Sequence, residues 1–188
     1  MTSLTLVAHA LTPALRGLVL GGDASPDPSG VEAARELKIV ADEVYSGPEI
    51  AARETASALG LAPVVVPALR DREYGDWTGR ELEELLEASP GVVATWLERP
   101  HTAPPGGETE NDVITRVADW LGDVVAAGVE SGAADRRTVA AVVHPAIVRA
   151  AVLYVLDAPA ESLRHVDVRP LSVVRLSAHA GSWSLTFG

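Results

Sequence analysis

The chain has 188 residues, of which 47% are hydrophobic, and this predicts a folded protein with a sizeable core rather than a disordered chain. It contains no cysteine, which excludes disulfides, thiolate metal sites and a cysteine nucleophile. Its formal net charge of -11 opposes non-specific nucleic-acid binding, because such binding needs Lys and Arg to replace the counterions at phosphates. We therefore expect no nucleic-acid partner.

The N-terminus and the apolar segments predict where the protein resides. Residues 1–3 carry no basic group and no long apolar stretch follows them, so the pattern of a signal peptide is absent. The apolar runs are interrupted well before the ~20 residues that a helix needs to span a bilayer. We expect a cytoplasmic protein without a membrane partner.

The first half of the chain predicts strands that alternate with helices. Residues 4–9 form an apolar run that ends in His9. Residues 10–29 are rich in Gly, Pro and Asp and predict a long loop, which in a compact domain is usually functional. The elements expected next are a helix over 30–37, a strand over 39–45, a helix over 49–59 and a strand over 64–66.

The second half begins with a charged, aromatic loop over 69–79. The elements expected after it are a short acidic helix over 81–88, a Pro- and Gly-rich loop over 100–107, an amphipathic helix from 109 to about 125, a polar linker over 128–137, a strand over 138–143, a helix over 147–156, and strands over 166–168, 172–176 and 183–187, the last two as a hairpin.

The alternation of strands and helices predicts an α/β fold. We expect a three-layer sandwich with a mainly parallel central sheet and helices on both faces. The late hairpin would cover one edge of the sheet. No internal repeat and no low-complexity segment interrupts the chain, so we interpret residues 1–188 as a single domain.

Two of the apolar strands each end in a histidine, His9 and His144. Ligands bind at the carboxyl ends of strands in α/β sheets, so neighbouring strands would place both imidazoles in one crevice. Imidazole titrates near pH ~6.5, which suits nucleophilic and acid–base work near neutral pH. The pair, with a carboxylate, could serve phosphoryl transfer, metal binding or acid–base chemistry on an uncharged substrate. The plainer alternative is that each histidine only caps its strand. The other three histidines, His101, His165 and His179, are expected at the surface.

Six segments in chain order resemble motifs of the histidine phosphatase superfamily, which has the phosphoglycerate-mutase-like fold. Residues 6–12 are similar to the opening motif around Arg-His-Gly, and residues 23–30 fit the spacing of Asp-x-Pro-Leu-Thr-x-x-Gly. The other segments are 46–56, similar to Ser-Pro-Leu-x-Arg-Ala-x-x-Thr-Ala; 69–79, similar to the acid-bearing loop that ends in Gly-x-Trp-x-Gly; 105–109, similar to Pro-Gly-Gly-Glu-Ser; and 142–149, similar to the second histidine motif. Together they cover essentially the whole chain.

The resemblance implies a role for each matching residue. The first histidine of the family attacks phosphorus and becomes phosphohistidine, and His9 matches it. His144 matches the second histidine, a phosphate ligand, and Asp71 matches the acid that protonates the leaving oxygen. Thr12 and Glu108 lie in matching motifs and are expected to bind substrate. The implied partner is a small, phosphorylated molecule, with no metal and no cofactor, and a homodimer stays open as the assembly.

The two arginines that hold phosphate in the family are missing. Ala8 and Ala51 stand at their positions, and Ala10 replaces the glycine after the first histidine. Pro145 and Ala146 replace two glycines after the second, and a proline has no N–H to donate. Losing one donor to a developing anion typically costs ~3 kcal/mol, or about 10²–10³ in rate.

Four other arginines could supply the lost charge. We expect Arg16, in the loop after the first histidine, and Arg72, beside the candidate acid, to bind substrate. Arg53 lies two residues beyond the missing helix arginine, about 200° around the helix, and is expected to face away. Arg149 is expected to form a salt bridge or to pack on its own helix.

The sequence leaves several functions open. The first is a divergent phosphomonoesterase or phosphomutase that acts through a phosphohistidine at His9. The second is a non-catalytic binding protein, which Ala8, Ala51 and the acidic charge favour. The third is an enzyme that uses the two histidines and Asp71 on a substrate without phosphate; a pocket without arginine would favour it over the first. A metal site is a fourth.

Overall fold

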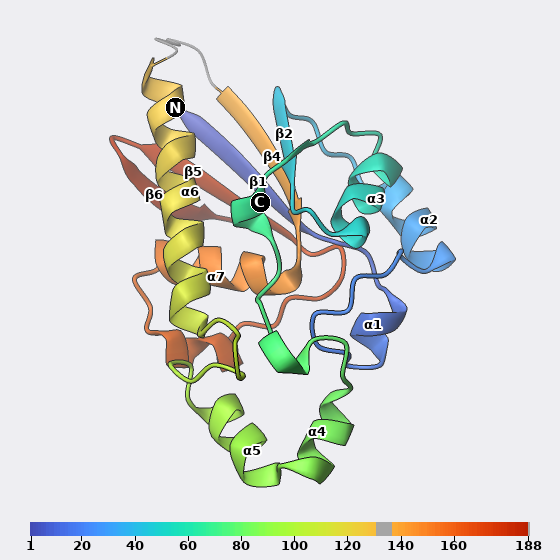
Figure 1. The fold of residues 1–188 in the computed structure, drawn as a ribbon. Coiled ribbons are helices and arrows are strands. Elements are labelled where there is room, and N and C mark those ends of the chain that lie inside the picture. Colours follow the sequence, from blue (N-terminus) through green and yellow to red (C-terminus); the bar gives the residue numbers. More distant parts are fainter. Residues whose placement is uncertain (131–136, 188) are drawn as a thin grey trace.

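A six-stranded sheet with the strand order β3-β2-β4-β1-β5-β6 forms the centre of the molecule (Figure 1). The structure is a computed structural model that describes residues 1–130 and 137–187. The strands from β3 to β1 are parallel, β5 is antiparallel to β1, and β6 is antiparallel to β5. This confirms the mainly parallel sheet and the late hairpin at its edge. The strands are β1 (Thr2–Ala8), β2 (Glu43–Ser46), β3 (Val64–Val65), β4 (Arg137–Val143), β5 (Val173–His179) and β6 (Ser182–Thr186).

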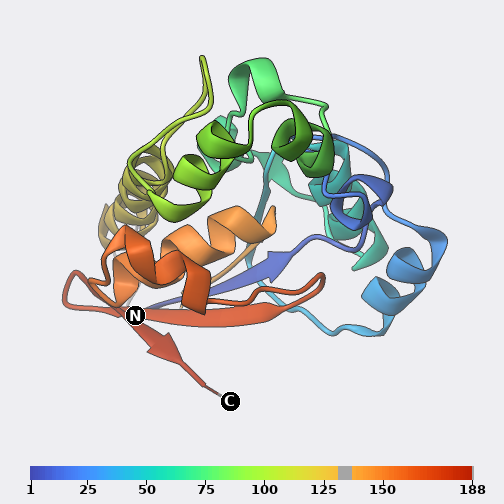
Figure 2. The same ribbon diagram turned by 90° about the horizontal axis from the view of Figure 1, so that it is seen from below.

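Helices lie on both faces of the sheet and beyond the carboxyl ends of its parallel strands. Figure 2 shows α4 and α5 over that end of the sheet. The helices are α1 (Pro13–Arg16), α2 (Pro28–Glu36), α3 (Ile50–Ala58), α4 (Leu82–Ala88), α5 (Pro90–Glu98), α6 (Glu110–Glu130) and α7 (Pro145–Val155), with 3-10 turns η1 (Pro67–Leu69), η2 (Gly75–Trp77) and η3 (Ala160–His165). In the described ranges, no helix has the length and apolarity to cross a membrane.

The core confirms the three layers, because successive residues of the central strands pack on opposite faces. Leu4 and Leu6 of β1 belong to the cluster that includes α6 and α7. Val7 belongs to a second cluster with Ala52 and Ala56 of α3. All five side chains are fully buried, and each large one contributes roughly 1.5–3 kcal/mol by leaving water.

Several predicted details differ from the structure. The loop predicted over 10–29 contains the short helix α1, and the strand predicted over 39–45 begins only at Glu43. Helix α5 was not predicted; it begins at Pro90 and turns Val93 and Trp96, three residues apart, toward the same small cluster. The strand predicted over 166–168 is wrong, because this segment follows η3 with no strand beside it, although Val168 packs against the main core. The linker predicted over 128–137 is shorter, since α6 continues through Glu130 and β4 begins at Arg137. The rest of that linker, 131–136, lies outside the described residues.

A hydrogen bond fastens the loop after β1 to α3. The backbone N–H of Ala10 donates to Oγ1 of Thr55 over 3.0 Å. Both residues have 0% exposure, so water cannot replace either partner. The carboxyl end of β1 is therefore held against a helix that the sequence places 45 residues later.

A second close contact fastens the loop that carries Asp71. Gly75 adopts a φ of 52°, and a Cβ at this position would lie 2.0 Å from the carbonyl oxygen of Pro105. Asp76 N–H donates to that same oxygen over 2.9 Å. Only glycine permits this approach of two backbones, so the segment 73–77 is locked onto residues 105–107.

Replacing Thr55 with Val should destabilise the protein by about 1–3 kcal/mol, because it leaves the buried Ala10 N–H without an acceptor. Thr55→Ser keeps the oxygen and should retain most of that stability. Urea unfolding followed by far-ultraviolet circular dichroism measures both variants. A Thr55→Val protein as stable as the native chain would contradict the role of this bond.

Replacing Gly75 with Ala should destabilise the protein by roughly 3 kcal/mol or more, because backbone strain and a steric clash add together. Gly79→Ala is the matched control: its φ is 79°, but nothing lies within 4 Å of the added Cβ. The control should cost only about 1–2 kcal/mol, the strain alone. Equal melting temperatures for the two variants would show that the contact with Pro105 is unimportant.

Candidate active site

The two histidines meet where the central strands end. β1 and β4 pair in parallel as far as Ala8 and Val143, and the next residue of each is His9 or His144. The N–H of His9 donates to the carbonyl of Val143 over 2.9 Å and continues the ladder. The imidazole centroids lie 5.1 Å apart with the rings tilted by 50°. The structure therefore brings the two predicted histidines into one site.

His9 is held as a neutral imidazole with a defined tautomer. Its side chain is buried, and Nδ1 lies 2.8 Å from the carbonyl oxygen of Ala10. A carbonyl only accepts, so Nδ1 carries the proton and Nε2 keeps the lone pair. Burial and then the charge of His144 lower the pKa of His9 to about 4, and the opposing effects of the Ala10 carbonyl and nearby carboxylates are smaller. At neutral pH the imidazole of His9 is therefore uncharged, and its Nε2 lone pair is free.

Asp71 forms a dyad with His144. Oδ1 of Asp71 lies 2.8 Å from Nδ1 of His144 and accepts from the N–H of Arg72 over 2.6 Å. Burial alone would raise the pKa of Asp71, but the charge and hydrogen bond of His144 outweigh burial and lower it. Nδ1 also lies 3.2 Å from the N–H of Ala146. One ring nitrogen cannot donate and accept at once; since Asp71 is ionised and closer, we assign the proton to Nδ1 and treat the Ala146 contact as the weaker one.

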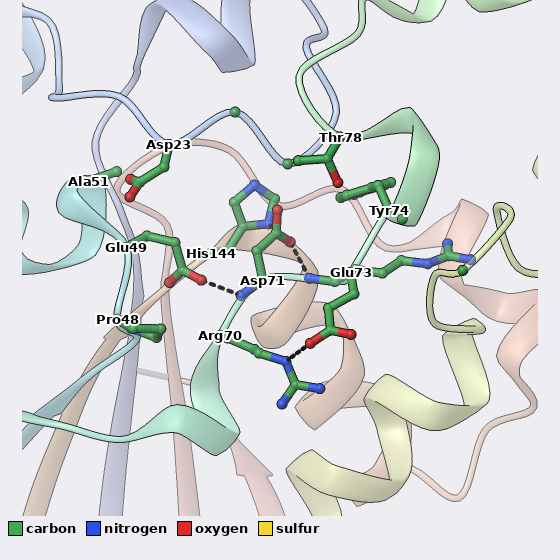
Figure 3. Close-up of a pocket in the computed structure, with 15 residues that line it drawn as sticks. Asp23, Pro48, Glu49, Ala51, Arg70, Asp71, Glu73, Tyr74, Thr78 and His144 are labelled. Atoms are coloured by element: carbon green, nitrogen blue, oxygen red, sulfur yellow. Dashed lines mark hydrogen bonds and ion pairs between the residues drawn. The ribbon is translucent and has the colours of Figure 1, made fainter.

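Two carboxylates that the sequence analysis missed also line the site (Figure 3). Glu49 caps α3 and accepts the N–H of Asp71 over 2.6 Å, and burial raises the pKa of Glu49. Asp23 accepts the N–H of Ile50 over 2.8 Å. Both residues lie within segments that resemble family motifs, which is the signal that could have identified them.

The site consists of two adjoining cavities. The outer cavity has a volume of about 470 Å³ and its lining includes Asp23, Glu49 and Ala51. The inner cavity has a volume of about 160 Å³ and its lining includes His9 and Thr12. Asp71, Tyr74 and His144 line both, so a ligand in either cavity can contact these three residues.

Both arginines expected to replace the lost clamp already contact other groups of the protein. Arg16 is largely exposed, pairs with Asp27 and lines neither cavity. Arg72 lines the outer cavity, but its Nε donates to the Glu108 carbonyl over 2.9 Å, its Nη2 to the Thr102 carbonyl over 3.2 Å, and its Nη1 to the carboxylate of Glu110. The guanidinium also stacks on Trp96, 5.1 Å from the ring centroid. In the structure, therefore, Arg16 lines neither cavity and the guanidinium of Arg72 is engaged by protein groups, while a substrate-binding role for either residue stays a prediction.

Arg149 is the arginine that the structure brings to the inner cavity. It is partly buried and lines that cavity together with His9 and His144. Of the two alternatives expected for Arg149, a salt bridge or a packing role, the structure shows no salt bridge to any residue that it describes, whereas the side chain is partly buried. Its place five residues after His144, on the helix that this histidine caps, was the available signal.

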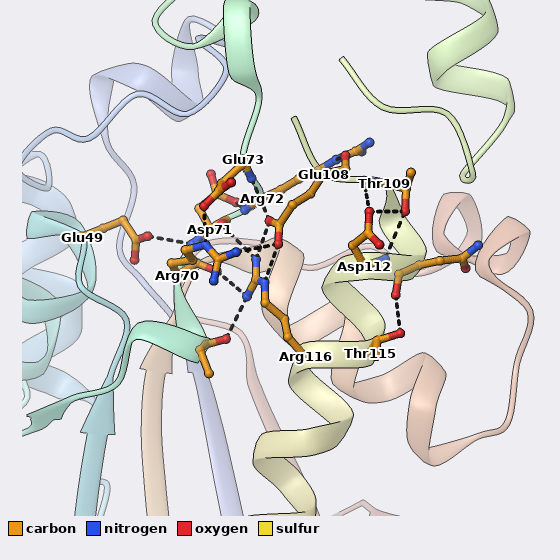
Figure 4. A network of polar contacts seen from close by, with 12 residues as sticks. Glu49, Arg70, Asp71, Arg72, Glu73, Glu108, Thr109, Asp112, Thr115 and Arg116 are labelled. Atoms are coloured by element: carbon orange, nitrogen blue, oxygen red, sulfur yellow. Dashed lines mark hydrogen bonds and ion pairs between the residues drawn. The ribbon is translucent and has the colours of Figure 1, made fainter. Parts of the chain in front are cut away.

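The remaining predicted substrate-binding residues differ in placement. Thr12 lines the inner cavity, and its Oγ1 accepts the N–H of Leu15 over 3.1 Å at the start of α1. Glu108 lies in a polar network outside both cavities (Figure 4). Its carboxylate accepts from Arg70 over 2.7 Å and from Arg116 over 2.9 and 3.0 Å. Although burial opposes it, these hydrogen bonds lower the pKa of Glu108, which acts as a structural anion.

The exposed residues agree with the sequence analysis in two respects. His101, His165 and His179 are exposed, and so is Arg53.

Across residues 1–130 and 137–187, no group of three or more His, Asp or Glu side chains is arranged to hold a metal ion.

Comparisons with known proteins agree with this geometry. The profile of the histidine phosphatase superfamily (branch 1) matches residues 21–187, so the match leaves out the segment that carries His9. A bifunctional protein of Mycobacterium tuberculosis is 32% identical over 129 residues, 68% of this chain and 34% of that protein. The chain thus spans about a third of the length of that relative.

A phosphatase is similar in both sequence and structure. Glucosyl-3-phosphoglycerate phosphatase of Mycobacterium tuberculosis is 33% identical over 102 residues, 53% of this chain and 46% of that enzyme. The solved structure of a mycobacterial glucosyl-3-phosphoglycerate phosphatase superposes with a TM-score of 0.84 and 28% identity over 97% of this chain and 96% of that one. The profile match over most of the chain, together with this shared fold, shows that the protein belongs to the histidine phosphatase superfamily.

Proposed function

We propose that the protein is a phosphomonoesterase that acts through a phosphohistidine at His9. The observation that carries this proposal is the buried, neutral imidazole whose Nδ1–H is tied to the Ala10 carbonyl, which leaves Nε2 as the attacking atom. An adjacent imidazole and carboxylate, His144 and Asp71, supply the proton-handling groups that phosphoryl transfer needs. The phosphatases among the relatives support the same reaction class.

The reaction proceeds in two steps. In the first, a bond forms between His9 Nε2 and phosphorus while the ester P–O bond breaks, and the leaving oxygen takes the proton of the singly charged phosphate by way of Asp71. In the second, water attacks phosphorus, the P–N bond breaks, and Asp71 accepts one proton of the water and passes it to the departing phosphate. Oδ2 of Asp71 makes no hydrogen bond with any described residue and is the atom that moves this proton.

The charge of the outer cavity determines which ionic form of the substrate reacts. Its charged lining has more carboxylates than arginines: Asp23, Glu49, Asp71 and Glu73 against Arg70 and Arg72. Ala51 stands where the family has a phosphate-binding arginine. A doubly charged phosphate is repelled more strongly than a singly charged one. The singly charged form, present below its second pKa of ~6, also carries the proton that Asp71 passes to the leaving oxygen.

Hydrolysis of p-nitrophenyl phosphate by the native chain and by His9→Ala tests the nucleophile. We expect turnover to fall by at least about 10³ without His9, because no other group can form the covalent intermediate. His165→Ala, at an exposed histidine outside the site, is the matched control and should keep full activity. Mass spectrometry at alkaline pH should find phosphate on His9. Undiminished turnover in His9→Ala would exclude the mechanism.

The pH dependence of kcat/KM should be bell-shaped and should lie on the acid side of neutrality. The acid limb should fall near pH 4, where His9 takes up a proton and loses its lone pair. The alkaline limb should fall near ~6, where the substrate becomes doubly charged. A rate profile over pH 3.5 to 8, with histidine titration by NMR as an independent check, measures both limbs. A His9 midpoint at its unfolded value of ~6.5 would show that burial does not control this residue.

A second function is favoured by the lining of the outer cavity. Its four carboxylates outnumber its two arginines, and Ala51 replaces the clamp arginine. This lining also suits an uncharged or cationic substrate, on which His9, His144 and Asp71 would act as an acid–base set. Absence of turnover of any phosphomonoester at micromolar enzyme, together with no binding of inorganic phosphate, would favour this reading over the phosphatase.

A further inference from the structure

Arg149 lies at the junction of the inner cavity and a third cavity of the structure. This third cavity, which we call the side cavity, has a volume of about 290 Å³, and Trp96, Leu97 and Leu163 form part of its apolar lining. Arg149 and Tyr74 line both the inner and the side cavity. A group bound at Arg149 therefore faces the two imidazoles on one side and an aromatic wall on the other.

The charge of Arg149 has no partner among the residues that the structure describes. No hydrogen bond or ion pair joins it to residues 1–130 or 137–187, whereas Arg70, Arg72 and Arg116 each contact a carboxylate. The nitrogens of Arg149 are not among the buried polar atoms that lack a partner, so they remain open to solvent or to a ligand. The fold therefore presents a positive charge without a protein partner in the cavity that His9 also lines.

The side cavity is mixed in charge apart from Arg149. Arg164 and the carboxylates of Glu98 and Glu161 lie on exposed parts of its lining, and Glu110 is occupied by Arg72. Its remaining lining is largely aromatic and aliphatic. These residues suit a compact, apolar organic group rather than a second strong anion.

We infer that Arg149 binds the phosphoryl group of the substrate and that the organic part of the ester lies in the side cavity against Trp96. The inference rests on the proposed function, and it names the cation and the substrate class for that site: a small phosphate ester with an apolar organic group. The positive charge is supplied from α7, which carries Arg149, instead of from β1 and α3, which carry Ala8 and Ala51.

Binding of inorganic phosphate to the purified protein, measured by calorimetry, tests this directly. Arg149→Met removes the charge with little change in length and should weaken phosphate binding at least about tenfold, the effect of losing one charged hydrogen-bond donor. Arg149→Lys should recover part of the affinity. Arg53→Met removes the same charge from an exposed position on α3 and should bind phosphate as the native chain does. A melting curve of each variant shows whether it is folded. If Arg149→Met is unfolded, the phosphate affinity of Arg149→Lys tests the role of Arg149 instead.

The substrate class is tested by the KM of a phosphate ester with an aromatic leaving group relative to a methyl phosphate ester. Trp96→Ala should raise KM for the aromatic ester and leave phosphate affinity unchanged.

Unchanged phosphate affinity in folded Arg149→Met, or no phosphate binding by the native chain at millimolar concentration, overturns the inference. His9-dependent turnover that survives Arg149→Met would reject the inference and leave the phosphatase standing. Phosphate binding that depends on Arg149, in a protein that shows no turnover, would support Arg149 as the phosphate-binding residue and reject the phosphatase.

Discussion

The parallel pairing of β1 with β4 is the constraint on which the site depends. These strands are the central pair of the sheet and are covered by helices on both faces, so their register is fixed by burial as well as by hydrogen bonds. A shift of one residue would turn every side chain to the opposite face and separate His9 from His144. The bond from Ala10 to Thr55 then holds the first residue of the loop, and with it the carbonyl that sets the tautomer of His9.

Burial acts differently on the two titrating groups at this junction. It keeps His9 neutral, while the dyad with His144 keeps Asp71 charged. The unfolded chain takes up a proton on His9 as the pH falls from ~6.5 to about 4 and the folded chain does not, so this residue opposes folding in that window by up to roughly 3 kcal/mol. Asp71 has a lowered pKa, so its stabilisation is present above ~3.8 and disappears as the pH falls through its folded value. The fold favours neutral pH, whereas the proposed chemistry favours weak acid.

The sequence predicts the parts of this molecule that depend on local pattern. Apolar runs that end in His9 and His144 predict the two central strands, and motif order predicts the position of Asp71 near them. The strand predicted over 166–168 fails because an alternating pattern cannot show that a neighbouring strand exists. The sequence also does not predict the ion-pair partners of Arg16 and Arg72, since Asp27 and Glu110 approach them only after the chain has folded. For Arg149 the sequence could not predict the opposite result, the lack of an ion-pair partner among the described residues, because this depends on which side chains surround it in three dimensions.

The distribution of arginines bears on specificity. Arg70 and Arg116 share Glu108, and Arg72 is saturated by Glu110 and two carbonyls, so these cations hold loops in place and cannot neutralise a ligand. If Arg149 is the cation that binds the phosphoryl group, as we infer, the phosphate group contributes less binding energy than in a site with two arginine clamps. The rest of that energy has to come from contacts with the organic part of the substrate. A phosphatase of this kind discriminates between esters through their organic group, and a generic ester, which fills little of the side cavity, reacts slowly for that reason.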